Sequence, residues 1–109
     1  MPTAYKVLGQ SAPSATTATT LYTVPSATSA VVSTINVCNR AASVDTFRIA
    51  VRPAGALLAT SHYLAYDTPI PANDSISVTI GVSLATTDVI TVYAGTANLT
   101  FAAFGAEIS

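Results

Sequence analysis

The chain has 109 residues, of which 50% are hydrophobic and only 8% are charged, and its formal net charge is −1. This length accommodates one domain of ordinary size, and the hydrophobic content excludes a disordered chain. With only four cationic residues, binding to nucleic acid through phosphate neutralisation is not expected.

Short runs of β-branched and aromatic residues recur along the chain between Pro, Gly, Asn or Asp, a pattern typical of an all-β domain. Eight runs are predicted as strands: 4–8, 20–24, 30–39, 46–52, 62–66, 75–80, 89–94 and 99–104. No segment carries the 3.6-residue apolar period of an amphipathic helix, so little helix is expected. Residues 55–60 are the one place where a short helical turn is predicted.

The chain carries no recognisable targeting segment. Residues 1–10 include one lysine but no apolar run of the kind that a secretion signal needs. Elsewhere, Thr, Ser, Pro and Asn interrupt every apolar run well before the roughly 18 residues of a membrane helix. We therefore expect a protein made in a cytoplasm, without a membrane partner.

Residues 1–19 are a candidate N-terminal arm. The stretch 11–20 is rich in Ser, Ala and Thr and contains no large apolar side chain, which is typical of a linker. Such a linker would let residues 1–10 pair with a neighbouring subunit. The alternative interpretation of the same stretch is an ordinary surface loop.

Alternation within the predicted strands indicates a two-sheet antiparallel sandwich over residues 1–109, of jelly-roll or Greek-key type. Ile35 and Val37, for example, alternate with Thr34, Asn36 and Cys38, so one set faces a core and the other faces outward. The predicted core consists of Tyr22, Val24, Val32, Ile35, Val37, Phe47, Ile49, Val51, Leu64, Ile76, Val78, Ile80, Leu84, Val89, Val92, Leu99 and Phe101.

The outward positions are mostly Thr, Ser, Asn and Ala, where an isolated sheet would commonly carry Lys and Glu. A monomer of this mass should expose about 5,700 Å², which leaves one charged side chain per roughly 600 Å². Soluble surfaces are usually much richer in charge. Either the hydroxyls and amides of Thr, Ser and Asn keep the chain soluble, or much of its surface is buried in an assembly. We expect burial in an assembly, with a contribution from these polar side chains.

Residues with catalytic potential are few and do not form a recognisable constellation. His62 is the only histidine, and its neighbour Ser61 would point to the opposite face of a strand, so the two make no dyad. Asp67 and Asp74 adjoin Pro-rich turns and are best explained as turn caps. The single cysteine, Cys38, is predicted to be a small buried strand residue. We expect no enzymatic activity, no cofactor and no metal site.

Three of the four cations, Arg40, Arg48 and Arg52, lie within 13 positions, and the latter two share one face of a predicted strand. They are interpreted as salt-bridge partners of another subunit or protein, as an ordinary solvated face, or as an anion or glycan contact. Tyrosines could add a sugar-stacking platform or be half-buried strand residues. The candidate platform consists of Tyr5, Tyr63, Tyr66 and Tyr93. The predicted partner-contact residues are Tyr5, Lys6, Arg40, Arg48, Arg52, Tyr63 and Tyr66.

Five phrases carry a resemblance to a known group of proteins. They are LYTVP at 21–25, VCNR at 37–40, FRIAVRP at 47–53, YDTPIPAND at 66–74 and DVITVYA at 88–94. In this order they resemble small virion proteins of tailed bacteriophages, cyanophages included, over nearly the whole chain from residue 21. The phrases are strand and turn segments with no catalytic signature.

The resemblance implies a small sandwich or jelly-roll module of a virion. It favours a capsid cement or decoration protein, a homotrimer on the capsid surface that binds across junctions between copies of the major capsid protein. Two other roles stay open. One is an adaptor of the tail, neck or head-fibre base, and the other is a fibre module that binds a receptor or glycan.

Overall fold

A computed structural model describes residues 3–109 and shows an all-β sandwich, as predicted, with eight strands in two antiparallel sheets of four. The strands are β1 (Thr3–Ser11), β2 (Thr19–Thr23), β3 (Ser29–Asn39), β4 (Asp45–Arg52), β5 (Tyr63–Ile70), β6 (Ser75–Leu84), β7 (Val89–Ala94) and β8 (Leu99–Ile108). In place of the helical turn predicted at 55–60, two 3-10 turns, η1 (Pro53–Gly55) and η2 (Thr60–His62), flank an irregular stretch.

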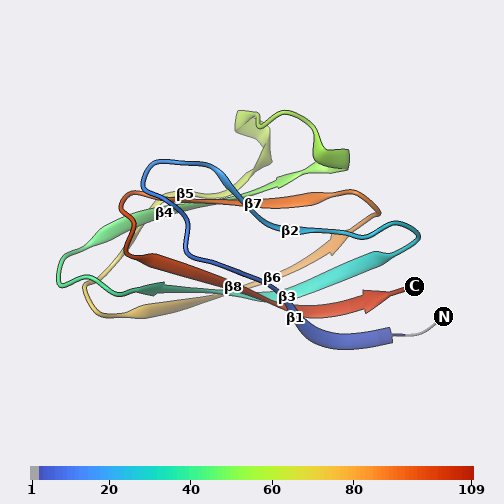
Figure 1. Cartoon of the computed structure of the whole chain (residues 1–109), viewed down its shortest axis with the longest axis horizontal. Coiled ribbons are helices and arrows are strands. Elements are labelled where there is room, and N and C mark those ends of the chain that lie inside the picture. The colour runs from blue at the N-terminus through green and yellow to red at the C-terminus, as the bar shows by residue number, and fades with distance from the viewer. Residues whose placement is uncertain (1–2) are drawn as a thin grey trace.

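The two sheets are built from nested strand pairs. Sheet A has the order β1-β8-β3-β6 and sheet B has the order β2-β7-β4-β5 (Figure 1). Thus β1 pairs with β8, β2 with β7, β3 with β6 and β4 with β5, as if one long hairpin were folded over on itself. Every connection crosses between the sheets except the one from β4 to β5. This is the connectivity of a jelly roll.

The core lies between the sheets, where Phe47 and Phe101 meet edge to face with ring centroids 6.3 Å apart. Leu64 was predicted to be in the core but is 50% exposed, because a register shift opposite Ile49 turns Ala65 inward instead. The predicted core residues Val51, Ile76, Val78 and Ile80 are partly buried at its margin, and Leu21, Ile70 and Ile90 join the core without having been predicted.

Four strands run several residues past the ends expected from the sequence: β1, β5, β6 and β8. β5 continues through Pro69, which the sheet tolerates because β5 is an edge strand. β6 continues past Gly81, which adopts a positive φ of 61°. β8 continues past Gly105, where a Cβ atom would collide with the carbonyl group of Val31 on β3. Glycine at this position allows the two strands to approach closely.

The N-terminal segment is part of sheet A in the single chain. Residues Thr3–Ser11 form β1 and pair antiparallel with β8 of the same chain, with a register shift between Val7 and Gly9. The following residues cross to sheet B, where the Thr16 amide donates to the carbonyl oxygen of Ala94. Residues 1 and 2 of the expected arm lie outside the described residues.

Asn39, at the end of β3, joins two connections at one end of the sandwich. Its side chain is buried, and its amide nitrogen lies 2.9 Å from the carbonyl oxygen of Ser43, 3.3 Å from that of Ile70 and 3.2 Å from that of Pro71. Its Oδ1 accepts the backbone N–H of Ala41. One side chain therefore fixes the β3–β4 and β5–β6 connections to each other.

Replacing Asn39 with Ala should lower the free energy of unfolding by about 2–3 kcal/mol, because the polar backbone groups lose their buried partner. Urea denaturation followed by circular dichroism measures the change. Asn36→Ala is the matched control, since Asn36 lies on the same strand but bonds only Ser77 at the exposed outer face. The control should change stability by less than about 0.5 kcal/mol, and equal losses would contradict the assigned role of Asn39.

Candidate functional site

The predicted contact residues are divided between the two sheets and do not form one site. Tyr5 and Lys6 lie on β1 of sheet A, whereas Arg48 and Arg52 lie on β4, and Tyr63 and Tyr66 on β5, of sheet B. Arg40 follows β3, and its Nη2 donates to the carbonyl oxygen of Ala97 at 2.9 Å. That contact gives Arg40 a role in holding the β7–β8 connection.

Arg48 is the centre of a cluster on the outer face of sheet B. Its Nε lies 2.7 Å from Oδ1 of Asp67 and its Nη2 lies 3.3 Å from Oδ2, so the carboxylate is held side-on by two nitrogens. The guanidinium carbon lies 4.1 Å from the ring centroid of Tyr66 and 4.2 Å from that of Tyr93. Tyr63 packs its ring against Tyr66, edge to face. The hydrogen bond to Asp67 raises the pKa of Arg48 above its usual range.

Asp67 is therefore an ion-pair partner, and its prediction as a turn cap was wrong. It lies inside β5 with φ of 48°, beside a register shift that lets its carboxylate reach Arg48. The sequence offered no signal for this, because the predicted strand ended at residue 66. The tyrosine platform is divided as well, since Tyr63, Tyr66 and Tyr93 gather around Arg48 while Tyr5 lies on the other sheet.

A second polar cluster joins the two sheets. Lys6 on β1 forms an ion pair with Glu107 on β8 at 2.6 Å, and the Tyr22 hydroxyl on β2 donates to the other oxygen of Glu107 at 2.6 Å. Hydrogen bonds from Lys6 and then Tyr22 lower the pKa of Glu107. Burial, followed by the hydrogen bond to Glu107, raises the pKa of Tyr22 above its usual range, which keeps the hydroxyl protonated.

On β3, β6 and β8, the residues that alternate with the core residues face outward. Within residues 3–109, none of these outward-facing residues is charged. At one end of this face a shallow hollow of about 620 Å³ is lined by apolar groups of Tyr5, Val31, Phe104 and Ile108, and by Lys6. Lys6 is the one charged residue bordering this hollow, and it is neutralised by Glu107.

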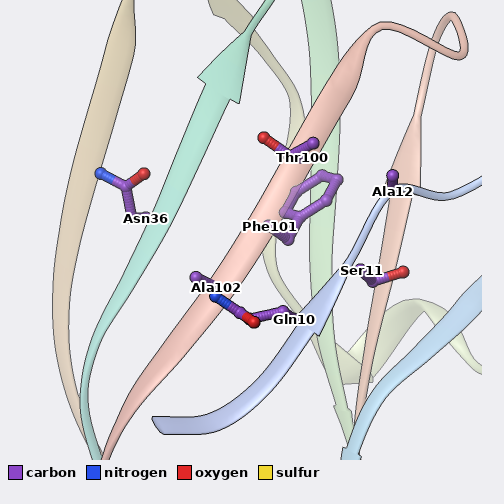
Figure 2. A pocket seen from close by; sticks show the side chains of 7 residues that line it. All are labelled: Gln10, Ser11, Ala12, Asn36, Thr100, Phe101 and Ala102. Carbon is purple, nitrogen blue, oxygen red and sulfur yellow. The ribbon is translucent and has the colours of Figure 1, made fainter.

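A second hollow, of about 380 Å³, lies at the other end of the same sheet (Figure 2). It is lined from three neighbouring strands: Gln10 and Ser11 come from β1, Asn36 from β3, and Thr100 and Ala102 from β8. Its polar groups are amides and hydroxyls. Ala12 and Phe101 complete its lining, so both hollows of sheet A are partly apolar, and the second one also carries several neutral polar groups.

The remaining residues with chemical potential have local contacts. The Nδ1 atom of His62 accepts the backbone N–H of Ala59, and Asp74 accepts that of Ser75, as expected of a turn cap. Cys38 is half-buried on the outer face of sheet A, so the prediction that it is buried was wrong. Within residues 3–109, no group of three or more His, Cys, Asp or Glu side chains is placed to hold a metal ion.

No family model matches the chain, and no curated protein sequence matches it at a significant level. Among the described residues, no helix is both long enough and apolar enough to cross a membrane.

Replacing Glu107 with Gln should flatten the acid limb of the stability curve. Because the folded-state pKa of Glu107 is lowered below its unfolded value, the stability it adds is fully present above the usual glutamate pKa of about 4.3 and is lost as pH falls through the lower, folded value. Urea denaturation of both proteins from neutral pH to below pH 4 measures the difference. Wild-type and variant curves that run parallel through this range would contradict the assignment.

Proposed function

We propose that the chain is a structural protein of a virion, a capsid cement or decoration protein that binds the assembled lattice of the major capsid protein as a homotrimer. The observation that supports this proposal most strongly is the neutral outer face of sheet A. The resemblance of the strand and turn phrases to small phage virion proteins points in the same direction.

The apolar end of this face has the character of a contact surface. Tyr5 is 86% exposed, Val7 is 48% exposed, and Val31 and Phe104 are each 38% exposed, and all four side chains lie on adjoining strands of one sheet. Large apolar side chains that gather at one place on a surface mark sites of protein contact, whereas scattered ones do not. Burying these side chains against another protein would remove them from water.

The edge of sheet A adds a second element to this surface. β1 is nine residues long, contains no proline, and leaves one side of its backbone unpaired. Its one cation, Lys6, is held by Glu107 and so does little to repel another strand. An exposed strand of this kind can extend its sheet by pairing with a strand of a neighbouring protein.

A cement protein works by mass action. It binds the assembled shell and not the free subunits, so its binding energy is added to the stability of the assembled state. Such a protein needs a broad surface that excludes water, and no catalytic group. The fold alone does not select this role, because jelly rolls also serve as lectins and as cupins.

Two other roles have distinguishable consequences. An adaptor at the tail, neck or head-fibre base would use the same neutral face but would occur in few copies per particle. A glycan-binding fibre module is favoured by the Tyr63, Tyr66 and Tyr93 side chains around Arg48, and it would bind sugars as the isolated protein.

The copy number in purified virions tests the proposal directly. Quantitative mass spectrometry of the particles, with the major capsid protein as internal reference, should find this chain in hundreds of copies. A count in the single digits or low tens would move the protein to the tail, neck or fibre base. Absence from the particles would contradict a virion role altogether.

Replacing Tyr5 with Asp should weaken binding to particles that lack the chain by at least about tenfold, because a carboxylate would be buried in an apolar contact. Co-sedimentation with the particles measures the affinity. Leu57→Asp is the matched control, since Leu57 is 90% exposed in the β4–β5 connection, away from sheet A. Both variants should keep the wild-type melting temperature, and equal effects on binding would contradict the assignment to sheet A.

A further inference from the structure

Arg52 and Thr91 carry buried polar atoms without partners on the outer face of sheet B. The Nε of Arg52 on β4 and the Oγ1 of Thr91 on β7 are both shielded from solvent, and neither has a hydrogen-bond partner among the described residues. Thr91 as a whole is only 6% exposed. Buried donors are almost always paired in folded proteins, so two orphans at one place indicate a site for a ligand.

Both residues border the same small cavity, of about 90 Å³, which is open to the surface. The other lining residues are Ala18, Thr20 and Leu58. The cavity therefore contains one cation, two hydroxyl-bearing side chains and no acidic group. Its volume is that of about three water molecules at ~30 Å³ each, enough for a carboxylate group with its first carbon atoms.

The edge of the Arg52 guanidinium formed by Nε and Nη2 has no hydrogen-bond acceptor among the described residues. The single hydrogen bond of this guanidinium runs from Nη1 to the carbonyl oxygen of Ala56, and Arg52 forms no ion pair within residues 3–109. The carboxylate of Asp88, in the β6–β7 connection, forms no hydrogen bond with Arg52. Its two oxygens accept the backbone N–H groups of Ala54 and Ala85. The Nε and Nη2 edge is left for an acceptor from outside the chain.

Arg48 shows what this edge binds. It precedes Arg52 by four residues on the same face of β4, and its Nε and Nη2 atoms hold the two oxygens of the Asp67 carboxylate. Side-on pairing with a planar carboxylate is the geometry that the guanidinium fork favours. Arg52 has the same edge unpaired and borders a cavity whose lining residues include no carboxylate.

We propose that the Arg52–Thr91 cavity is a binding site for a carboxylate group, held side-on by Nε and Nη2 of Arg52 and by a hydrogen bond from the Thr91 hydroxyl. The carboxylate can belong to a free small acid or to an acidic side chain of another protein. This site lies on the sheet opposite the proposed capsid contact, and it does not depend on the proposed function.

The chain has only three arginines, so the site can be followed by NMR through three Arg Nε–Hε signals. Sodium acetate should shift the Arg52 signal saturably, with a dissociation constant of about 1 mM or weaker for so small a ligand. Acetamide and ionic-strength-matched sodium chloride should not. A blocked aspartyl peptide, compared with its asparaginyl counterpart, tests whether a protein side chain can also enter.

Two variants test the named donors. Because Arg52→Gln also removes the reporter signal, binding to this variant is followed through the backbone amide of Thr91, whose saturable shift with acetate should disappear. The shape-conserving Thr91→Val, followed through the Arg52 signal, should weaken acetate binding about fivefold through loss of one hydrogen bond. Arg40→Gln, which removes an arginine at the other end of the sandwich, should leave binding unchanged.

Several results would overturn the proposal. The absence of a saturable shift would mean that the cavity holds only water. An equal response to chloride or acetamide would remove the selectivity for a carboxylate, and an equal response of the Arg40 signal would reduce the effect to general screening. Unchanged binding by Thr91→Val would remove Thr91 from the site.

Discussion

The nested pairing of the strands is the constraint on which the rest of the structure depends. The pairs β1–β8 and β3–β6 lie in sheet A and the pairs β2–β7 and β4–β5 lie in sheet B, so every connection except the one from β4 to β5 crosses an end of the sandwich. Each strand then has one face on a shared core, so the period-two apolar pattern decides which side chains pack together. The polar groups of the crossing connections need partners at those ends, and Asn39 provides several of them at once.

The few charged side chains serve this architecture more than they serve solubility. Lys6 and Glu107 link an edge strand to its neighbour and, through Tyr22, to the other sheet. Arg48 on β4 is paired with Asp67 on the neighbouring strand β5, on the outer face of sheet B. Because these charges are satisfied within the chain, they leave the outer strand faces to hydroxyl, amide and apolar groups. Arg52 departs from this arrangement, which is why its environment points to a ligand.

The sequence predicted the fold class, the existence of all eight strands and most of the core, because those features depend on short-range alternation. It failed where a local irregularity changed the register. The shift near Ile49 exposed Leu64 and turned Ala65, which is partly buried, toward the core. The left-handed conformation of Asp67 placed an expected turn residue inside β5. Arg48, Tyr63 and Tyr66 were each predicted as contact residues, but their contacts with one another were not predicted, because those contacts depend on the same irregularity. Strand order brings Thr91 beside Arg52, and no local pattern encodes it.

The two outer faces differ because only one sheet contains a connection between its own neighbouring strands. The β4–β5 connection, with η1 and η2, rises over sheet B and contacts β7 and β4 (Figure 1). Beneath it, Ala50 and Thr91 are buried although they face away from the core, and Leu58 of the connection borders the same cavity as Thr91. Sheet B therefore cannot lie flat against a partner, whereas sheet A has no such covering segment along residues 3–109. A broad lattice contact of the kind proposed is sterically compatible with sheet A, and the covered face of sheet B is suited instead to a small group that enters a cavity.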